Sequence, residues 1–298
     1  MKKLLVALVC VVVVQAAEVK PPEFLGADYS AGKVCRVNPE GKVTWEISAP
    51  NTCDVWQLPN GNVLFAYVKG VKEVDADKKI VWEYKADPKE EVYACQRLAN
   101  GDTLVGELGA CRLIEVAPDG KTIKKEVKLP AKGGQHARFR NARKLDNGNY
   151  LFAALSEAVV KELDGQGQVV WSVKTVGNPF CAIRLPNGNT LVGCGDAHRI
   201  QEFDKDGKVV WEVGENDPLF VGADGKEERI PLRFVGGLQR LPNGNTVVSN
   251  WLGHGFIGKG THLLELTPAK KVLWRNDDHK AFRTIASACL VGVAGVVR

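Results

Sequence analysis

The sequence predicts an all-β fold built from a repeated unit of four short strands. The most regular copy is 181–213, CAIRLPNGNTLVGCGDAHRIQEFDKDGKVVWEV. It contains four apolar runs that are each long enough for a strand and too short for a helix. The runs span 182–185, 190–192, 200–203 and 209–213. Asn187-Gly188 between the first two predicts a two-residue type I′ turn, and 204–207 predicts a second tight turn. Such a unit forms a four-stranded antiparallel sheet that cannot bury both faces alone.

Two anchors identify the other copies of this unit, an Asn-Gly turn and a tryptophan that ends the fourth strand. Five full units carry the turn sequences QLPNGNVLF, RLANGDTLV, KLDNGNYLF, RLPNGNTLV and RLPNGNTVV. Their fourth strands end in Trp82, Lys124 in place of tryptophan, Trp171, Trp211 and Trp274. A partial unit at 24–47 matches 190–213 without a gap and ends in Trp45, but it has no first strand.

The missing first strand has one candidate, the apolar segment 284–293, which belongs to no other unit. Pairing the two ends of the chain in one sheet closes a ring and removes exposed sheet edges. About 280 residues in six units give roughly 47 residues each, the size of one propeller blade. We therefore expect 18–298 to be a single domain, a six-bladed β-propeller of four-stranded antiparallel blades closed by the C-terminal strand.

Residues 1–17 have the pattern of a secretory signal peptide. Two lysines precede an apolar run at 4–14, and small residues follow that suit cleavage after Ala16 or Ala17. The run is too short to span a bilayer as a helix. Cys10 leaves a lipoprotein as an alternative, although Val9 is a poor residue before a lipidated cysteine. We expect a secreted or periplasmic protein with no membrane span after cleavage.

The charge of the chain argues against a nucleic-acid partner. Removal of Lys2 and Lys3 reduces 40 basic residues to 38 against 35 acidic ones, so the formal charge falls from +5 to +3. No cluster of lysine and arginine is interleaved with aromatic residues. We expect a monomer that binds a small anionic ligand or a protein partner and that needs no cofactor.

Seven cysteines remain after cleavage, in a compartment where disulfides persist. A turn at Asn187-Gly188 would pair residues whose numbers sum to 375, which places Cys181 opposite Cys194. Opposed Cα atoms in an antiparallel pair lie about 4.5 to 5.5 Å apart, within disulfide range. We predict this disulfide, with two buried thiols as the alternative. The spacing leaves open the state of Cys35, Cys53, Cys95, Cys111 and Cys289.

The insertions relative to the repeat collect at one end of the ring. The first and third hairpins of each blade lie at one end of the ring and are regular in length. The insertions lie at the other end, which carries the second hairpins and the links between blades; they are 129–140, 214–234 and 251–261. Irregular loops on a rigid scaffold are where binding groups usually lie. We expect a basic channel mouth there, with Trp251, Phe139 and Phe234 as its apolar wall. The residues expected to bind ligand are His136, Arg138, Arg140, Trp251, His254, Lys259 and His262.

The alternative for each of these residues is that it is solvated or caps backbone carbonyls. A metal site is not expected, because His254 and His262 have no third ligand spaced with them.

The repeat motifs resemble those of two propeller families. The D-x-x-G-K-x-x-W pattern at 204–211, with looser forms ending at Trp45, Trp82 and Trp171, resembles the tryptophan-docking motif of pyrroloquinoline-quinone-type propellers. The LPNGN turns resemble those of arylsulfotransferase-like secreted propellers. Together these resemblances cover nearly all of the chain after residue 17. They imply the architecture more than an activity.

The functional residues of those families are not carried over. Arylsulfotransferase-like propellers often open a blade with a histidine-aspartate pair, and this chain has no histidine there. The corresponding positions are Cys53-Asp54, Tyr93-Ala94, Arg140-Asn141, Phe180-Cys181 and Gly236-Gly237. Quinoprotein dehydrogenases usually have eight blades and adjacent cysteines, whereas this chain has six units and no Cys-Cys.

Three functions are therefore open. The first is a non-enzymatic propeller that binds a ligand or partner at the irregular end. The second is a transferase or hydrolase that uses His136 or His254, with Arg138 and Arg140 holding an anionic substrate. The third is a quinone or metal oxidoreductase.

Overall fold

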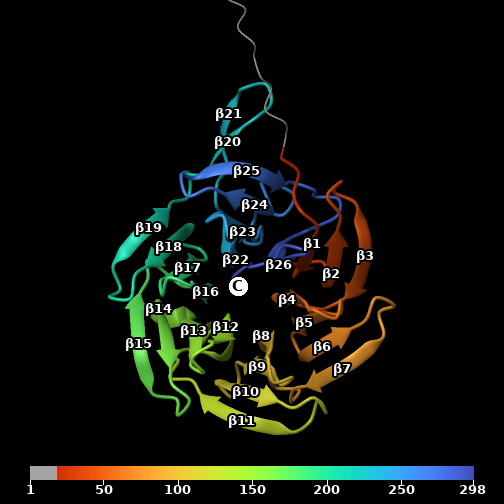
Figure 1. Ribbon diagram of the computed structural model, residues 1–298, viewed down its shortest axis with the longest axis vertical. Helices are drawn as coiled ribbons and strands as arrows, with labels where there is room; N and C mark the ends of the chain where they lie inside the picture. The colour runs from red at the N-terminus through yellow and green to blue at the C-terminus, as the bar shows by residue number, and fades with distance from the viewer. Residues whose placement is uncertain (1–18) are drawn as a thin grey trace, which may run out of the picture.

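A computed structural model describes residues 19–298, in which six antiparallel sheets are arranged in a ring (Figure 1). Two short 3-10 helices, η1 (Gln135–Ala137) and η2 (Leu155–Glu157), lie in the connections. The predicted all-β, six-bladed propeller fold is confirmed. The predicted signal peptide at 1–17 lies outside the described residues.

Each blade is named here from its innermost to its outermost strand. Blade I has β26 (Ile285–Leu290), β1 (Phe24–Asp28), β2 (Lys33–Val37) and β3 (Val43–Ser48). Blade II has β4 (Asp54–Gln57), β5 (Val63–Tyr67), β6 (Gly70–Val74) and β7 (Ile80–Lys85). Blade III has β8 (Val92–Arg97), β9 (Thr103–Glu107), β10 (Arg112–Val116) and β11 (Ile123–Lys128).

The other three blades follow the same order. Blade IV has β12 (Ala142–Lys144), β13 (Tyr150–Ala154), β14 (Val159–Leu163) and β15 (Val169–Lys174). Blade V has β16 (Cys181–Arg184), β17 (Thr190–Cys194), β18 (Arg199–Phe203) and β19 (Val209–Val213). Blade VI has β22 (Val235–Arg240), β23 (Thr246–Asn250), β24 (Leu263–Leu266) and β25 (Lys271–Asn276).

The two ends of the described chain meet in blade I, as predicted. β26 pairs antiparallel with β1, from Phe24 opposite Leu290 to Asp28 opposite Ile285. All six residues of β26 are buried. The last strand therefore supplies the first strand that the N-terminal unit lacks.

In four of the six blades the repeated tryptophan joins its blade to the next one, whereas blade III has Lys124 there and Trp274 of blade VI donates to Glu265 of its own blade. The indole Nε1 of Trp45 donates to the carbonyl of Ala76 at 3.1 Å, and that of Trp211 donates to the carbonyl of Pro268 at 2.8 Å. Trp82 and Trp171 make the same contact with the third hairpins of blades III and V. The docking motif is thus a device for blade packing.

The other repeated residues also hold neighbouring blades together. Arg184 on β16 of blade V pairs with Glu162 of blade IV at 2.6 Å, and Asn149 donates to the other oxygen of that carboxylate. Equivalent pairs between blades are Arg97–Glu73, Lys144–Glu115 and Arg240–Glu202. The strongest signals in the sequence therefore report architecture and leave the site to residues outside the repeat.

The first hairpin of blade V differs from the predicted turn by one residue. Leu185 N–H donates to the Asn189 carbonyl at 2.8 Å, and only Gly188 in the loop has a positive φ, of 87°. The loop therefore has three residues, a type I turn followed by a left-handed glycine, instead of a two-residue type I′ turn.

This change of register overturns the predicted disulfide. Cys181 lies opposite Gly193, not opposite Cys194. Because successive strand residues point to opposite faces, Cys181 and Cys194 belong to two different core clusters. Both are free thiols, as are Cys35, Cys53, Cys95, Cys111 and Cys289.

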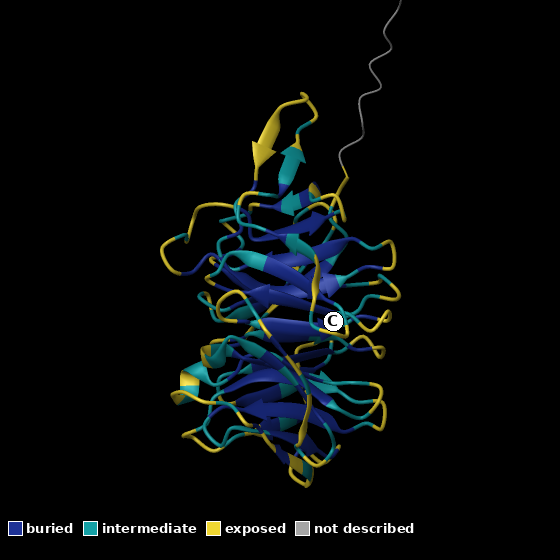
Figure 2. Cartoon of the chain, turned by 90° about the vertical axis from the view of Figure 1, so that its left-hand side faces the viewer, coloured by how far each residue is buried: buried dark blue, intermediate teal, exposed yellow. Residues whose placement is uncertain are grey.

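The insertion 214–234 folds mostly outside the ring. It forms a hairpin of β20 (Leu219–Val221) and β21 (Glu227–Arg229). β20 pairs parallel with β25, the outermost strand of blade VI. Figures 1 and 2 show this hairpin projecting from the rim, with β21 exposed. Only the last residues of the insertion, which include Phe234, return toward the axis, so most of it does not contribute to the channel mouth expected at this end.

Between residues 19 and 298, no helix has the length and apolar character needed to cross a bilayer.

Candidate functional site

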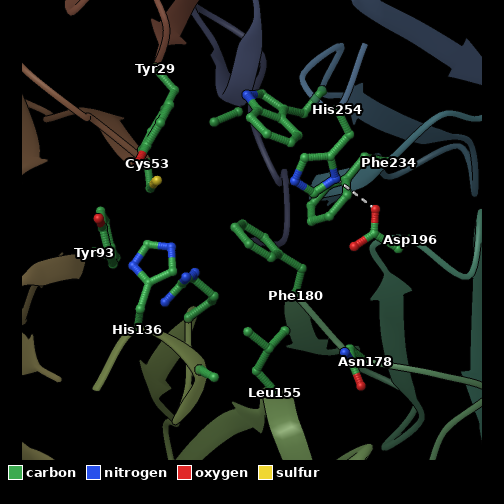
Figure 3. Close-up of a pocket in the computed structure, with 14 residues that line it drawn as sticks. Tyr29, Cys53, Tyr93, His136, Leu155, Asn178, Phe180, Asp196, Phe234 and His254 are labelled. Carbon is green, nitrogen blue, oxygen red and sulfur yellow. Dashed lines mark hydrogen bonds and ion pairs between the residues drawn. The ribbon is translucent and has the colours of Figure 1, made fainter. Parts of the chain in front are cut away.

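A cavity of about 360 Å³ opens on the axis of the ring, at the end that carries the blade links and second hairpins. Residues from all six blades line it (Figure 3). The insertions 129–140 and 251–261 both reach it, through His136 and His254 among others.

The deepest lining residues occupy equivalent positions in their blades. Each one lies just before the innermost strand or near its start, where the chain turns down along the axis. Four of them line this cavity, namely Cys53, Tyr93, Arg140 and Phe180. These are the positions at which arylsulfotransferase-like propellers carry histidine. The repeat therefore directs this register position toward the axis, whatever residue occupies it.

Aromatic side chains form most of the wall. Phe234 packs edge-on against Phe180 at 4.8 Å and against Trp251 at 5.1 Å between ring centroids. Tyr29 lies 6.1 Å from Trp251 and 6.5 Å from Tyr93. Such a wall suits a flat apolar group.

Arg140 is the one cation that lines this cavity among the described residues. It is only 6 % exposed, and its guanidinium lies 4.8 Å from the centre of the Tyr93 ring. Its Nη1 donates to the Phe139 carbonyl at 3.2 Å, and no carboxylate within 19–298 forms an ion pair with it. Burial lowers the pKa of Arg140, yet a guanidinium stays charged in proteins. Glu91 acts on Arg140 electrostatically but contacts His136 instead. A buried charge without a paired carboxylate is costly, so this group favours an anion beside it.

Two histidine–carboxylate pairs lie at the cavity wall. His136 Nδ1 is 2.9 Å from Glu91 Oε2, and His254 Nδ1 is 2.8 Å from Asp196 Oδ1. Figure 3 shows both imidazole rings at the cavity, with the contact of His254 and Asp196 drawn as a dashed line. Because Nδ1 is engaged, Nε2 is left as the atom that can meet a ligand.

The other polar groups of the cavity are held neutral. Burial raises the pKa of the Cys53 thiol to about 12, so this thiol is protonated and a poor nucleophile. Burial also raises the pKa of Tyr29 above its ordinary value. Within residues 19–298, no group of three or more His, Cys, Asp or Glu side chains is placed to hold a metal ion.

The cavity brings together His136, Arg140, Trp251 and His254 from the predicted set, with Phe234 in the wall. Phe139 does not line it. Phe139 is fully buried between blades III and IV, where it packs edge-on against Phe152 at 6.3 Å.

Three further residues expected to bind ligand lie elsewhere. Arg138 donates to the carbonyls of Leu108 and Gly109, which is the capping role left open as the alternative. Lys259 is exposed on its loop, away from the cavity lining. His262 is fully buried, and its Nε2 lies 3.0 Å from His279 Nδ1.

Sequence reasoning missed several lining residues that lie outside the three insertions. They are Tyr29, Cys53, Tyr93, Phe180 and Asp196. A usable signal existed for three of them, because Cys53, Tyr93 and Phe180 share the blade-opening register with Arg140.

The ring and its axial cavity define a six-bladed β-propeller with a ligand-sized pocket at one end. A family model described as "Mal s 1 allergenic protein-like" matches residues 123–269, just under half of the chain. None of the curated proteins matches the sequence.

The solved structures extend this comparison across the chain. A protein of unknown function from Bacteroides caccae is 29 % identical, with a TM-score of 0.80 over 93 % of this chain and 100 % of that one. Catalytically inactive virginiamycin B lyase from Staphylococcus aureus, solved with quinupristin, is 16 % identical, with a TM-score of 0.55 over 85 % of this chain and 86 % of that one. A streptogramin B lyase is 14 % identical, with a TM-score of 0.56 over 83 % and 79 % of the two chains. The two lyases share the fold alone.

Proposed function

We propose that this propeller is a binding protein for a small organic anion with an aromatic part. The observation that carries this proposal is Arg140, a buried guanidinium without a carboxylate partner in an aromatic cavity. A guanidinium binds a carboxylate, sulfate or phosphate through two parallel hydrogen bonds. The aromatic wall covers the flat apolar part of the same ligand.

The dimensions of the cavity favour a small ligand over a protein segment. Its volume of about 360 Å³ lies at the lower end of the range of small-molecule sites. The charged group is at the floor, and the histidine–carboxylate pairs are at the mouth, where they can contact polar groups at the far end of the ligand.

The test is calorimetric titration with benzoate, phenylacetate, indole-3-acetate and phenyl sulfate, with benzamide as a neutral counterpart of benzoate. At least one of these anions should bind, and benzamide should bind more weakly than benzoate. Arg140→Met should lower the affinity about 10- to 100-fold, because hydrogen bonds to a charged group contribute about 1.5–3 kcal/mol. The fold should persist, because no carboxylate loses its partner.

Arg138→Met is the matched control, since Arg138 lies two residues away and does not line the cavity. It should leave the affinity unchanged. If Arg140→Met binds the same anion as well as the wild-type protein does, the site is misassigned. The protein is then better described as a propeller that binds partners through its surface.

A second candidate function is catalysis by the histidine–carboxylate pairs. A histidine whose Nδ1 contacts a carboxylate presents Nε2 as a general base or acid. This arrangement corresponds to a transferase or hydrolase acting on an anionic aryl ester. It is favoured by the distances of 2.9 and 2.8 Å at His136 and His254.

Release of nitrophenol from 4-nitrophenyl sulfate and 4-nitrophenyl phosphate, which are both anionic aryl esters, tests this second candidate. If it holds, His136→Gln or His254→Gln should reduce kcat at least 100-fold while the affinity for the aryl anion is retained. If the wild-type protein releases nitrophenol no faster than buffer does, or if both variants are as fast as the wild type, catalysis by these histidines is excluded. The binding function is then the one that stands.

The proposed setting is the periplasm or the extracellular space, with the protein as a monomer. The pattern of residues 1–17 supports secretion. The ring supports a monomer, because β26 and β1 close it within one chain.

A further inference from the structure

A second and much smaller cavity lies beneath Arg140 on the axis. Its volume is about 20 Å³, which is room for one small ion or water molecule. Arg140, Tyr93, Cys53 and Phe180 line both cavities, whereas Arg143 and others further along the innermost strands line only the lower one.

Three arginines converge on this small space, Arg140, Arg143 and Arg298. Arg143 is neutralised by Asp54, whose two oxygens it contacts at 2.7 and 3.0 Å. Arg140 and Arg298 form no ion pair with any carboxylate in the described part of the chain. The side chains that line the cavity therefore include two guanidinium groups without a paired carboxylate, Arg140 and Arg298.

The hydrogen-bond donors around the cavity are also incompletely satisfied. Arg298 Nη2 donates to the carbonyls of Val55 at 2.7 Å and Ala288 at 2.9 Å, and the guanidinium lies 4.2 Å from the Trp56 ring. Its Nε and Nη1 are buried and have no partner within residues 19–298, and the same holds for Arg143 Nε. A buried donor without a partner costs about 1–3 kcal/mol, and more when it is charged.

We propose that the lower cavity binds one monovalent inorganic anion of about the size of chloride. Such an ion can accept hydrogen bonds from any direction, and it neutralises part of the positive charge of the guanidinium groups. A water molecule could accept hydrogen bonds but would leave the charge in place. A substituted carboxylate is too large for about 20 Å³, so this site is separate from the aryl-anion site above it.

Thermal unfolding in different salts tests the proposal on the whole protein. Sodium chloride and sodium bromide should raise the melting temperature in a saturable way relative to sodium gluconate at equal ionic strength, because gluconate is too large to enter. A rise of roughly 3 °C is expected at a halide concentration about ten times the Kd. Equal melting temperatures in the three salts would contradict the proposed anion site.

Arg298→Gln should remove this halide-specific rise. Arg283→Gln is the control, because the Arg283 side chain is exposed and forms no hydrogen bond or ion pair with the described residues. If Arg298→Gln does not fold, crystals of the wild-type protein grown in sodium bromide decide the question. An anomalous bromide peak between Arg140 and Arg298 supports the site. Peaks confined to the outer surface, with none in the cavity, refute it.

Discussion

His262, which precedes β24 of blade VI, contacts the half-buried His279. His262 is fully buried, and its Nε2 lies 3.0 Å from His279 Nδ1. Burial, and then repulsion from the neighbouring His279, lowers the pKa of His262 to about 4. The folded protein therefore holds this imidazole neutral, whereas the unfolded chain protonates it near pH 6.5.

The free energy of unfolding should consequently fall as the pH falls from about 6.5 to about 4. The unfolded state takes up a proton in this window and the folded state does not, so His262 destabilises the fold by up to about 3 kcal/mol at the acid end. Urea unfolding at a series of pH values measures this slope.

His262→Gln should flatten that part of the pH profile, and His254→Gln, which changes an exposed ring, should not. A His262→Gln profile parallel to the wild-type profile would show that other groups cause the loss of stability.

Arg138 and Arg140 show what sequence can and cannot predict for a single residue. Both lie in the same insertion, and both were predicted to bind an anion. The structure uses Arg138 to cap the carbonyls of Leu108 and Gly109 and places Arg140 at the axis. Composition cannot separate the two residues. The repeat register can, because Arg140 corresponds to Cys53, Tyr93 and Phe180, which also face the axis.

At the scale of elements, strand positions could be predicted far better than strand register. The apolar runs and the Asn-Gly anchors locate β16 and β17, but they do not show whether the loop has two or three residues. Gly188 alone takes a positive φ, so the loop has three. That one residue moves Cys194 away from Cys181 and removes the predicted disulfide.

The hairpin of β20 and β21 could not be predicted for a different physical reason. β20 is apolar but only three residues long, and β21 consists of three charged, exposed residues, so neither has the length and apolar pattern of a blade strand. β20 becomes a strand because the outer edge of β25 offers free backbone groups to pair with. That edge is defined only once the blade has folded.

At the scale of the molecule, the number of blades and the closure were predictable because each blade repeats the residues that dock it. The cavity was not, because each blade, with the link that precedes it, supplies only one to four residues to it, and nearly all of them come from the links and the second hairpins. The ring is therefore specified by similarity among the units, and the site by the differences among them.

Deleting residues 284–298 tests directly whether β26 closes the ring. This truncation removes β26, exposes the edge of β1 and opens the core around Phe24 and Leu25. Ile285 and Leu290 alone account for about 3–6 kcal/mol of burial, which is a large fraction of the stability of an ordinary domain. We expect no cooperative melting transition, and aggregation measurable by light scattering.

A deletion at the rim provides the control for this truncation. Replacing residues 220–228 by two glycines removes most of the β20–β21 hairpin and leaves the buried Ile230 and Leu232 in place. It should lower the melting temperature by only a few degrees, because blade VI then ends at β25, much as the other blades end at their fourth strands. A synthetic peptide of residues 284–298 should restore melting to the truncated protein by refilling the vacant strand position. A truncated protein that melts like the full chain without the peptide would show that β26 does not hold the ring closed.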